Sequence, residues 1–363
     1  MILHFYLARR FLWTFLAIVM IFVVLLALIE LIDDLRSFSA LPFGDVVEIV
    51  LLKVPEANYE ILPLVIILAS VAMFLRMSRS SELVVVRAAG RSGLRALIAP
   101  LTVALLIGVV SVSMLNPIVA ASAKRHNDLV NTYLGWGSAV MAIAPEGIWL
   151  RQGNDDGQTV IHARRASSDV SVLFNTTFFS FTHDGAPLRR IAAKEARLGD
   201  GAWHLTNVKL WDLSLGVNAE ANAQELDSYD VPSSLTHDRI IDSFGKPEYI
   251  SIWDLPDFIA QLEHSGFSAR RYAVWFQMEL ARPLFLVALV MMAAAFTMRH
   301  SRLHNSGVSV LTAVLLGFGL HYIRNFAQIL GENGQIPILL AAWAPAVASF
   351  LLAFGILLHM EEG

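Results

Sequence analysis

The sequence contains no cysteine. Disulfide bonds, thiolate catalysis, iron–sulfur clusters and cysteine-based zinc sites are therefore excluded. Charged residues are also few, at 16% of 363 residues, and the net charge is only -4. So small a net charge gives no reason to expect nucleic acid as a partner. Hydrophobic residues make up 56% of the chain, a share typical of membrane proteins.

Six apolar stretches reach the roughly 20 residues that a helix needs to cross a bilayer. Three precede a long polar middle segment and three follow it. We expect spans at about 11–32, 56–76, 97–118, 272–298, 307–329 and 337–358. The first run lacks a small-residue cleavage site, so we interpret it as a retained helix and not as a signal peptide.

This distribution predicts a membrane α-helical protein with six transmembrane helices in a 3+3 arrangement and an inserted all-β domain. Helices 1–3 are expected within residues 1–120, together with a cytoplasmic helix at 80–97. The inserted domain is expected at 121–265, and helices 4–6 at 266–363.

The middle segment has the period of strands. Its runs "GIWLRQ", "TVIHARR", "SVLFNTTFFSFT" and "AWHLTNVKLWDL" are rich in β-branched and aromatic residues, and "GNDDG", "HDGAP" and "LGDGA" separate them. This pattern predicts an antiparallel sandwich or open barrel. A surface helix should follow in "SIWDLPDFIAQLEHSGF". The scattered histidines lack ligand spacing, so neither a metal nor a cofactor is expected.

Arginine placement predicts the orientation in the membrane. The N-terminus, the loops at 77–96 and 299–306 and the C-terminus fall on one side, and nine arginines lie there. The short loops opposite, 33–55 and 330–336, hold only Arg36 and Lys53 as basic residues. The arginine-rich side is therefore predicted to be cytoplasmic, which places the middle domain on the other side.

The segment "SELVVVRAAGRSGLRAL" fits a short amphipathic helix in one of the arginine-rich loops. Its arginines form one stripe, its apolar and small residues form an adjacent one, and Glu82 lies in the first turn. One interpretation is an interfacial helix whose arginines reach lipid phosphates. The other is a docking helix, whose small face admits a partner backbone while Glu82 meets a partner arginine.

The same segment, with the two residues before it, resembles the cytoplasmic coupling helix of the LptF/LptG permease family. Further matches are "LIDDLRSF" after the first span, "YAVWFQMELARPLFLVALVMM" in the fourth and "IPILLAAWAPA" at the start of the sixth. The six-span layout with a middle β domain is also similar to that family. The ending "LIDDLR" favours the LptG branch over LptF.

The resemblance implies a permease subunit of an ABC exporter that extracts lipopolysaccharide from the inner membrane of Gram-negative bacteria. It implies a multi-pass protein whose middle domain is a periplasmic jellyroll-like domain. The implied partners are an LptB-like ATPase dimer, an LptF-like second permease, an LptC-like protein and an LptA-like periplasmic bridge. The implied ATPase-docking residues are Glu82, Leu83, Arg87, Ala88, Gly90 and Arg91.

The resemblance implies that a separate subunit hydrolyses ATP and that the chain itself is not an enzyme, and the lack of any GxxxxGK[ST] segment agrees with this. A lipid with phosphorylated sugars needs an apolar cavity with a cationic rim, and arginine donates two bonds at once to phosphate. The candidates for this rim are Arg36, Lys124, Arg125, Arg270, Arg271 and Arg324. The alternative is an interfacial anchor, for Arg36 paired to Asp33.

Glu279 and Arg282 lie one turn apart within the fourth span. Unpaired charges would be costly there, so we expect the two to pair toward the bundle interior, as a structural pair or in gating. Two other functions stay open from the residues. One is a non-transporting, mechanotransmitting ABC-type membrane protein. The other is a membrane-embedded lipid-modifying enzyme that uses His321 or the Glu279–Arg282 pair.

Overall fold

The computed structural model covers the whole chain and divides it into two compact units. One unit is helical and comprises residues 1–130, 248–253 and 270–363; the other holds the sheet and comprises residues 131–247 and 254–269. The structure describes all residues except 1, 81, 83–91, 134–140, 145–146, 155–156, 168–170, 183, 200, 215–217, 234, 236–244, 265–266, 299–305 and 363.

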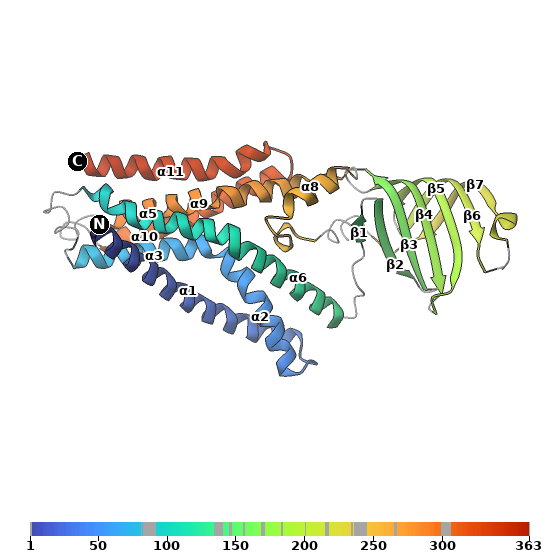
Figure 1. Ribbon diagram of the computed structural model, residues 1–363, viewed down its shortest axis with the longest axis horizontal. Helices are drawn as coiled ribbons and strands as arrows, with labels where there is room; N and C mark the ends of the chain where they lie inside the picture. Colours follow the sequence, from blue (N-terminus) through green and yellow to red (C-terminus); the bar gives the residue numbers. More distant parts are fainter. Residues whose placement is uncertain are drawn as a thin grey trace. The chain divides into compact units, whose positions relative to one another are not determined.

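The helical unit contains six helices that are long and apolar enough to cross a membrane, within the described residues. Its helices are α1 (Ile2–Ser37), α2 (Phe43–Glu60), α3 (Leu62–Arg79), α5 (Gly93–Val110), the π-helical turn η1 (Ser111–Leu115), α6 (Asn116–Tyr133), α9 (Arg270–Thr297), α10 (Ser306–Glu332) and α11 (Ile338–Glu362). The predicted membrane protein of six spanning helices is therefore confirmed. The N- and C-termini lie at the same end of the unit (Figure 1).

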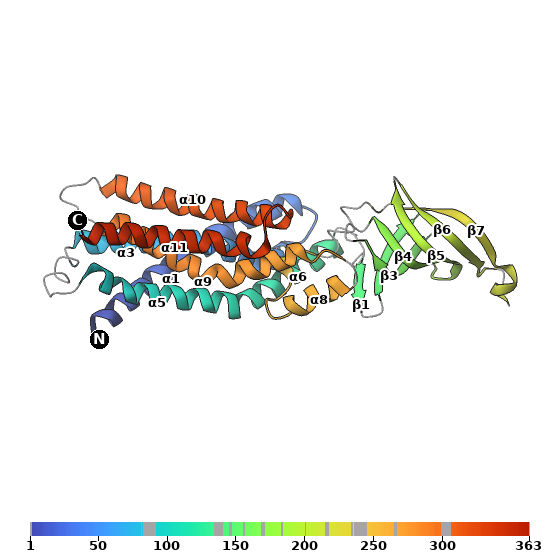
Figure 2. The same ribbon diagram turned by 90° about the horizontal axis from the view of Figure 1, so that it is seen from above.

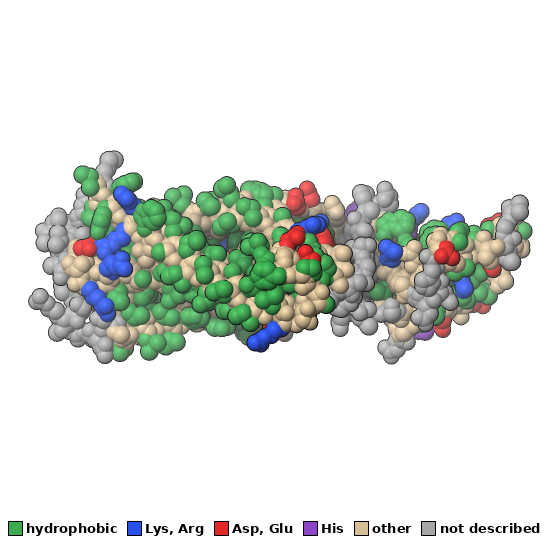
Figure 3. Space-filling model, turned by 90° about the horizontal axis from the view of Figure 1, so that it is seen from below, with side chains coloured by type: hydrophobic (Ala, Val, Ile, Leu, Met, Phe, Trp, Pro, Cys, Tyr) green, Lys and Arg blue, Asp and Glu red, His purple; other side chains and the backbone are tan. Residues whose placement is uncertain are grey.

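Helix α9 forms the centre of this unit, and α3, α5, α10 and α11 pack around it (Figures 1 and 2). Most of its side chains are buried, whereas few side chains of α1 are buried. The helical unit therefore presents a broad hydrophobic surface, with charged side chains toward its ends (Figure 3). A surface of this kind is compatible with lipid and not with water.

The helices differ from the predicted spans at their ends; the first, for example, begins at Ile2 and not at 11. The helix is interrupted at Ile61, so the second span begins at Leu62. The preceding residues belong to the separate helix α2. The third span continues without interruption from Gly93 to Val130, well beyond its predicted end at 118. Hydropathy missed this extension because α6 carries polar residues such as Lys124, Arg125 and Asn127.

Small residues allow the helices to approach closely. A Cβ atom on Gly108 of α5 would lie 2.6 Å from the Cα of Pro283 in α9. One on Gly317 of α10 would lie 1.8 Å from Ile67 Cδ1. Close helix packing is thus present at both positions. It is absent at Gly319, where a Cβ would meet nothing within 4 Å in the described part of the chain.

The π-helical turn η1 lies within the continuous third span, between α5 and α6. The main-chain oxygen of Ser113 in this turn accepts a 3.1 Å hydrogen bond from the indole nitrogen of Trp253. Asn116, at the start of α6, accepts a 2.8 Å bond through Oδ1 from the main-chain N–H of Ile252. The turn therefore fastens the segment 248–253 to the helical unit.

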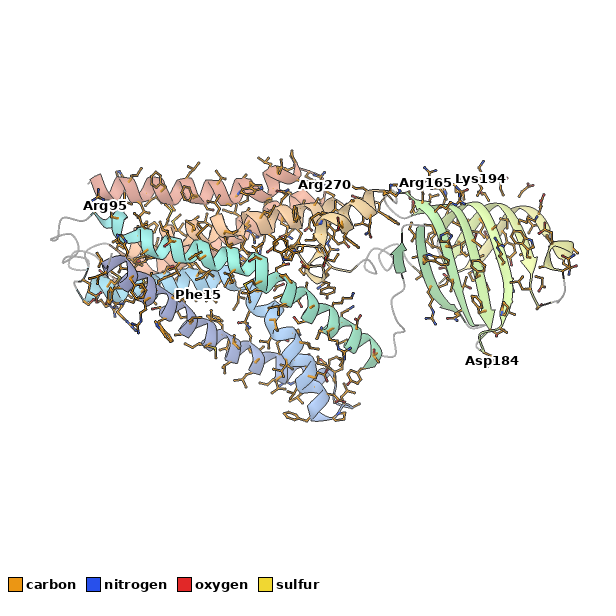
Figure 4. All side chains as sticks on the ribbon, in the orientation of Figure 1. Phe15, Arg95, Arg165, Asp184, Lys194 and Arg270 are labelled. Atoms are coloured by element: carbon orange, nitrogen blue, oxygen red, sulfur yellow. The ribbon has the colours of Figure 1, made fainter. Side chains whose placement is uncertain are left out.

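The second unit contains a seven-stranded antiparallel sheet whose strands follow one another in chain order. The strands are β1 (Met141–Ala144), β2 (Gly147–Asn154), β3 (Gly157–Ala166), β4 (Val172–Thr182), β5 (Pro187–Gly199), β6 (Ala202–Asp212) and β7 (Gln224–Pro232). The inserted all-β domain is confirmed, and its described strands form a meander. Arg165 and Lys194 lie along one edge of this unit and Asp184 at the opposite edge (Figure 4).

The sheet curls back on itself. The side chain of Gln152 in β2 donates a 3.0 Å bond to the main-chain oxygen of Pro232 at the end of β7, and it accepts one of 2.7 Å from Ser233. Alternate side chains form an apolar inner face in which Phe178 meets Trp203 edge to face. Of the expected open barrel and sandwich, this curled single sheet is closer to the barrel.

Four strands lie where the sequence places them, but β1, β5 and β7 were not predicted. Strand β5 is rich in charged residues and alternates them with small buried ones, Ala193 among them, so its hydrophobic signal is weak. Strand β7 is an edge strand and almost fully exposed. The turns follow the expected chemistry, since Gly185 and Gly201 both adopt φ of 80°. The predicted surface helix is α8 (Leu255–His264), which buries Leu255 and Leu262.

Candidate functional site

The first polar cluster of the helical unit surrounds Glu82, at the end where both termini lie. Arg10 of α1 forms an ion pair with Glu82 Oε2, and the hydroxyl of Tyr6 donates to the same oxygen at 3.3 Å. Ser80, just after α3, donates to Oε1 at 2.7 Å. The carboxylate is thus held from two sides and links the start of the predicted docking helix to α1.

The environment of Glu82 favours its ionised form. Burial alone would raise the pKa of this carboxyl, but hydrogen bonds from Ser80, Arg10 and Tyr6 and the charge of Arg10 outweigh it and lower the pKa. Glu82 therefore carries its charge at neutral pH. The other predicted docking residues lie outside the described residues: Leu83, Arg87, Ala88, Gly90 and Arg91.

A second polar cluster lies buried among α2, α9 and α10. Arg282 donates a 2.6 Å bond from Nη2 to Glu279 Oε1, and Tyr59 of α2 donates its hydroxyl to Glu279 Oε2. The guanidinium also lies 3.9 Å from the centre of the Tyr59 ring and bonds the main-chain oxygen of Tyr59 at 3.2 Å. The expected pairing of Glu279 with Arg282 in the bundle interior is confirmed.

Arg324 of α10 adds a second cation to this buried cluster. Its side chain is only 6% exposed and forms no ion pair within the described residues. It donates a long 3.4 Å bond to the main-chain oxygen of Met278 and lies 5.5 Å from the ring of Phe285. Glu279 is already engaged by Tyr59 and Arg282, so the cluster holds one positive charge in excess.

The predicted rim residues differ in their exposure and in their contacts. Arg36, Lys124 and Arg125 are exposed, and Arg271 is half-buried. Arg270 lies at the end of the helical unit opposite Arg95 (Figure 4). It donates to the main-chain oxygens of Gly331 at 2.6 Å and of Ile336 at 2.5 Å, which caps the end of α10.

Sequence reasoning missed the partners of these predicted residues. Tyr59 precedes the second span and carries no pattern that links it to Glu279, 220 positions away. Arg10 is one of the basic residues at the N-terminus, and its spacing does not mark it as a partner of Glu82. The one local signal was Tyr6, which lies four residues before Arg10 and therefore on the same face of the helix. Arg10 donates a 2.8 Å hydrogen bond to the hydroxyl of Tyr6. Tertiary packing selects these pairs, and spacing along the chain does not.

Comparison with known proteins places this geometry in a family. Residues 5–359 match the family model described as "Lipopolysaccharide export system permease LptF/LptG". The chain is 21% identical over 361 residues to the lipopolysaccharide export system permease protein LptG of Escherichia coli strain K12, with 98% of this chain and 97% of the relative covered. It is 22% identical to the protein of the same name from Haemophilus influenzae, with 98% of each chain covered. The match to the family model spans nearly the whole chain, and so the chain belongs to the LptF/LptG family of lipopolysaccharide export permeases.

Proposed function

We propose that this chain is the LptG-like permease subunit of an ABC exporter in the inner membrane of a Gram-negative bacterium. The exporter extracts lipopolysaccharide from the outer leaflet and passes it to a periplasmic bridge, and the sheet unit lies in the periplasm. The observation that carries the proposal is the family match over residues 5–359, on a chain with six spans and an inserted sheet.

The motor is a separate ATPase dimer of the LptB type. Its docking surface on this chain comprises Glu82, Leu83, Arg87, Ala88, Gly90 and Arg91, in the segment between α3 and α5. Because the Glu82 carboxylate is bonded to Arg10, a movement of the docking segment reaches α1 directly. The ion pair therefore supports a role for α1 in the response to ATP binding.

The remaining partners are an LptF-like second permease, an LptC-like membrane protein and an LptA-like bridge. A second six-span permease would cover part of the hydrophobic face of this unit, and lipid would cover the rest. The substrate contacts are Arg36, Lys124, Arg125, Arg270, Arg271 and Arg324. Among them Arg324 has the strongest structural support, since its buried charge lacks an acidic partner among the described residues.

The test is co-purification of the tagged full-length chain from its native membranes. Recovery of an ATPase and a second six-span permease is expected, and the chain purified alone should hydrolyse no ATP. Recovery of the complex without lipopolysaccharide release to a periplasmic acceptor would favour the non-transporting alternative. A covalent change in lipid produced by the chain alone would favour the lipid-modifying enzyme.

A further inference from the structure

Three carboxylates gather on one face of α1, near the end that leads into α2. Glu30, Asp33 and Asp34 occupy positions i, i+3 and i+4 of the helix, which places their side chains side by side. One carboxylate oxygen from each residue lies within 4.8 Å of the corresponding oxygens of the other two. Like charges this close repel one another, so the group needs a cation to be stable.

One oxygen of the most buried of the three carboxylates lacks a hydrogen-bond partner. Asp34 is only 6% exposed, and its Oδ2 is fully buried with no donor near it in the described part of the chain. A buried carboxylate oxygen without a donor is costly, and native structures rarely leave one unsatisfied. The unpaired oxygen therefore indicates that a bound ligand contacts it, because no donor of the described residues does.

The chain supplies only part of the countercharge. Lys53 of α2 forms an ion pair with Glu30 but with neither aspartate. His126 of α6 lies within electrostatic range of Asp34 and Lys53, and a neutral imidazole adds no charge. Arg36, one turn beyond Asp33, is exposed and forms no ion pair within the described residues. When all three carboxylates are ionised, they and one ammonium carry two negative charges in total, the number that one divalent cation neutralises.

We propose that Glu30, Asp33 and Asp34 bind one divalent cation, and Ca²⁺ in preference to Mg²⁺. Carboxylate oxygens are the ligands that hard divalent cations prefer. Ca²⁺ takes about six to eight oxygen ligands in flexible geometry, whereas Mg²⁺ keeps several waters and usually binds one or two carboxylates. Three carboxylates whose oxygens lie within 4.8 Å of one another therefore suit Ca²⁺ better.

The ion competes with Lys53 for Glu30. With Ca²⁺ bound, the ammonium of Lys53 gives up Glu30, while Asp34 gains a ligand for its unpaired oxygen. Histidine and cysteine spacing does not reveal this site, because all three ligands are carboxylates. Binding requires only these side chains and no partner subunit, so it goes beyond the proposed export function and is tested without a transport assay.

The experiment is equilibrium dialysis of the full-length protein against radioactive Ca²⁺. The protein is first treated with a chelator and kept in an uncharged maltoside detergent, which offers no phosphate or carboxylate. We expect saturation at one Ca²⁺ per chain, with weaker competition by Mg²⁺. Asp34→Asn should weaken Ca²⁺ binding by on the order of tenfold, since affinity follows the charge of the ligands. The control Glu48→Gln, an exposed carboxylate on α2, should leave it unchanged.

A second pair of variants covers the case in which Asp34→Asn does not fold. Lys53→Met removes the competing ammonium and should tighten Ca²⁺ binding, whereas Asp33→Asn should weaken it. If Lys53→Met and Asp33→Asn changed the Ca²⁺ affinity in the same direction, or if neither changed it, the proposal would be overturned. The absence of saturable binding by the unmodified protein would overturn it as well. Equal binding by Asp34→Asn would also overturn it, because the ion would then be held by co-purified lipid.

Discussion

Glu279 and Arg282 form a buried ion pair one turn apart on α9, and the ring of Tyr59 from α2 covers it. The exposed fractions of the two side chains are 0% and 4%. Because Tyr59 also bonds Glu279 through its hydroxyl, the pair joins α2 to the central helix of the unit. One polar contact thus connects a helix that does not span the membrane with one that does.

Glu279→Gln should destabilise the helical unit strongly. The substitution leaves the guanidinium of Arg282 buried without a countercharge, which typically costs about 3–5 kcal/mol. Thermal unfolding of the detergent-solubilised protein measures the loss. The double variant Glu279→Gln/Arg282→Met should recover most of it, and Glu48→Gln on the exposed face of α2 serves as control. A double variant as unstable as the single one would contradict this account.

Arg324→Met should separate stability from function. Replacing an unpaired buried cation with an apolar side chain should leave the melting temperature unchanged or raise it. If Arg324 binds a lipid phosphate, the same variant should lower photo-crosslinking of lipopolysaccharide to α10. Arg270→Met is the matched control, because Arg270 caps α10 and its loss should lower stability. A large loss of stability in Arg324→Met would assign Arg324 a structural role.

Glu82→Ala should uncouple ATP hydrolysis from export while the complex still assembles. Complementation of a depletion strain and the ATPase rate of the purified complex measure the two activities. The charge swap Arg10→Glu/Glu82→Arg restores the ion pair within the chain but reverses the charge offered to a partner. Rescue by the swap would show that the contact with α1 is sufficient, and failure would favour a direct contact with the ATPase. Normal export by Glu82→Ala would refute both roles.

Gly108→Ala should destabilise the unit by about 1–3 kcal/mol, the usual effect of overpacking. Its new Cβ would lie 2.6 Å from the main chain of Pro283, which has little room to shift. Gly319→Ala is the control, since its Cβ meets nothing within 4 Å and alanine favours helix by up to about 1 kcal/mol. Unfolding midpoints should therefore move in opposite directions. Equal shifts would argue against close packing at Gly108.

Arg36→Glu should lower crosslinking of lipopolysaccharide to α1. Its side chain is exposed, so reversing its charge should disturb phosphate binding and leave the fold intact. The melting temperature should stay within about a degree of the unmodified protein. Arg9→Glu, exposed near the other end of the same helix, is the control. Unchanged crosslinking would make Arg36 an interfacial anchor.

The fold was largely predictable because a membrane span can be recognised from a long run of apolar residues. Every span was found, and the errors were confined to ends such as Ile61, where the chain turns without a change in hydropathy. Strands were found where β-branched and aromatic residues gather. Strand β5 was missed because its buried positions hold small residues such as Ala193 and Ala196. Alanine has no β-propensity to reveal it.

The candidate sites were less predictable, because their key contacts join distant segments. The pair Glu279–Arg282 was found since both residues lie on one helix turn. Tyr59, Arg10 and Lys53 were not assigned partners, since each meets its carboxylate only after two helices have packed. Local periodicity carries no information about such contacts.

The length of the third span has a mechanical consequence. From Gly93 to Val130 the helical backbone runs unbroken for 38 residues, about 57 Å at 1.5 Å per residue. A bilayer core takes up only about 30 Å of this. One continuous helix therefore starts just after the segment proposed to dock the motor and ends at Val130, the last residue of this part of the helical unit. A push or twist on its first turn would travel along the main chain of a single helix and would need no relay of side chains to reach Val130.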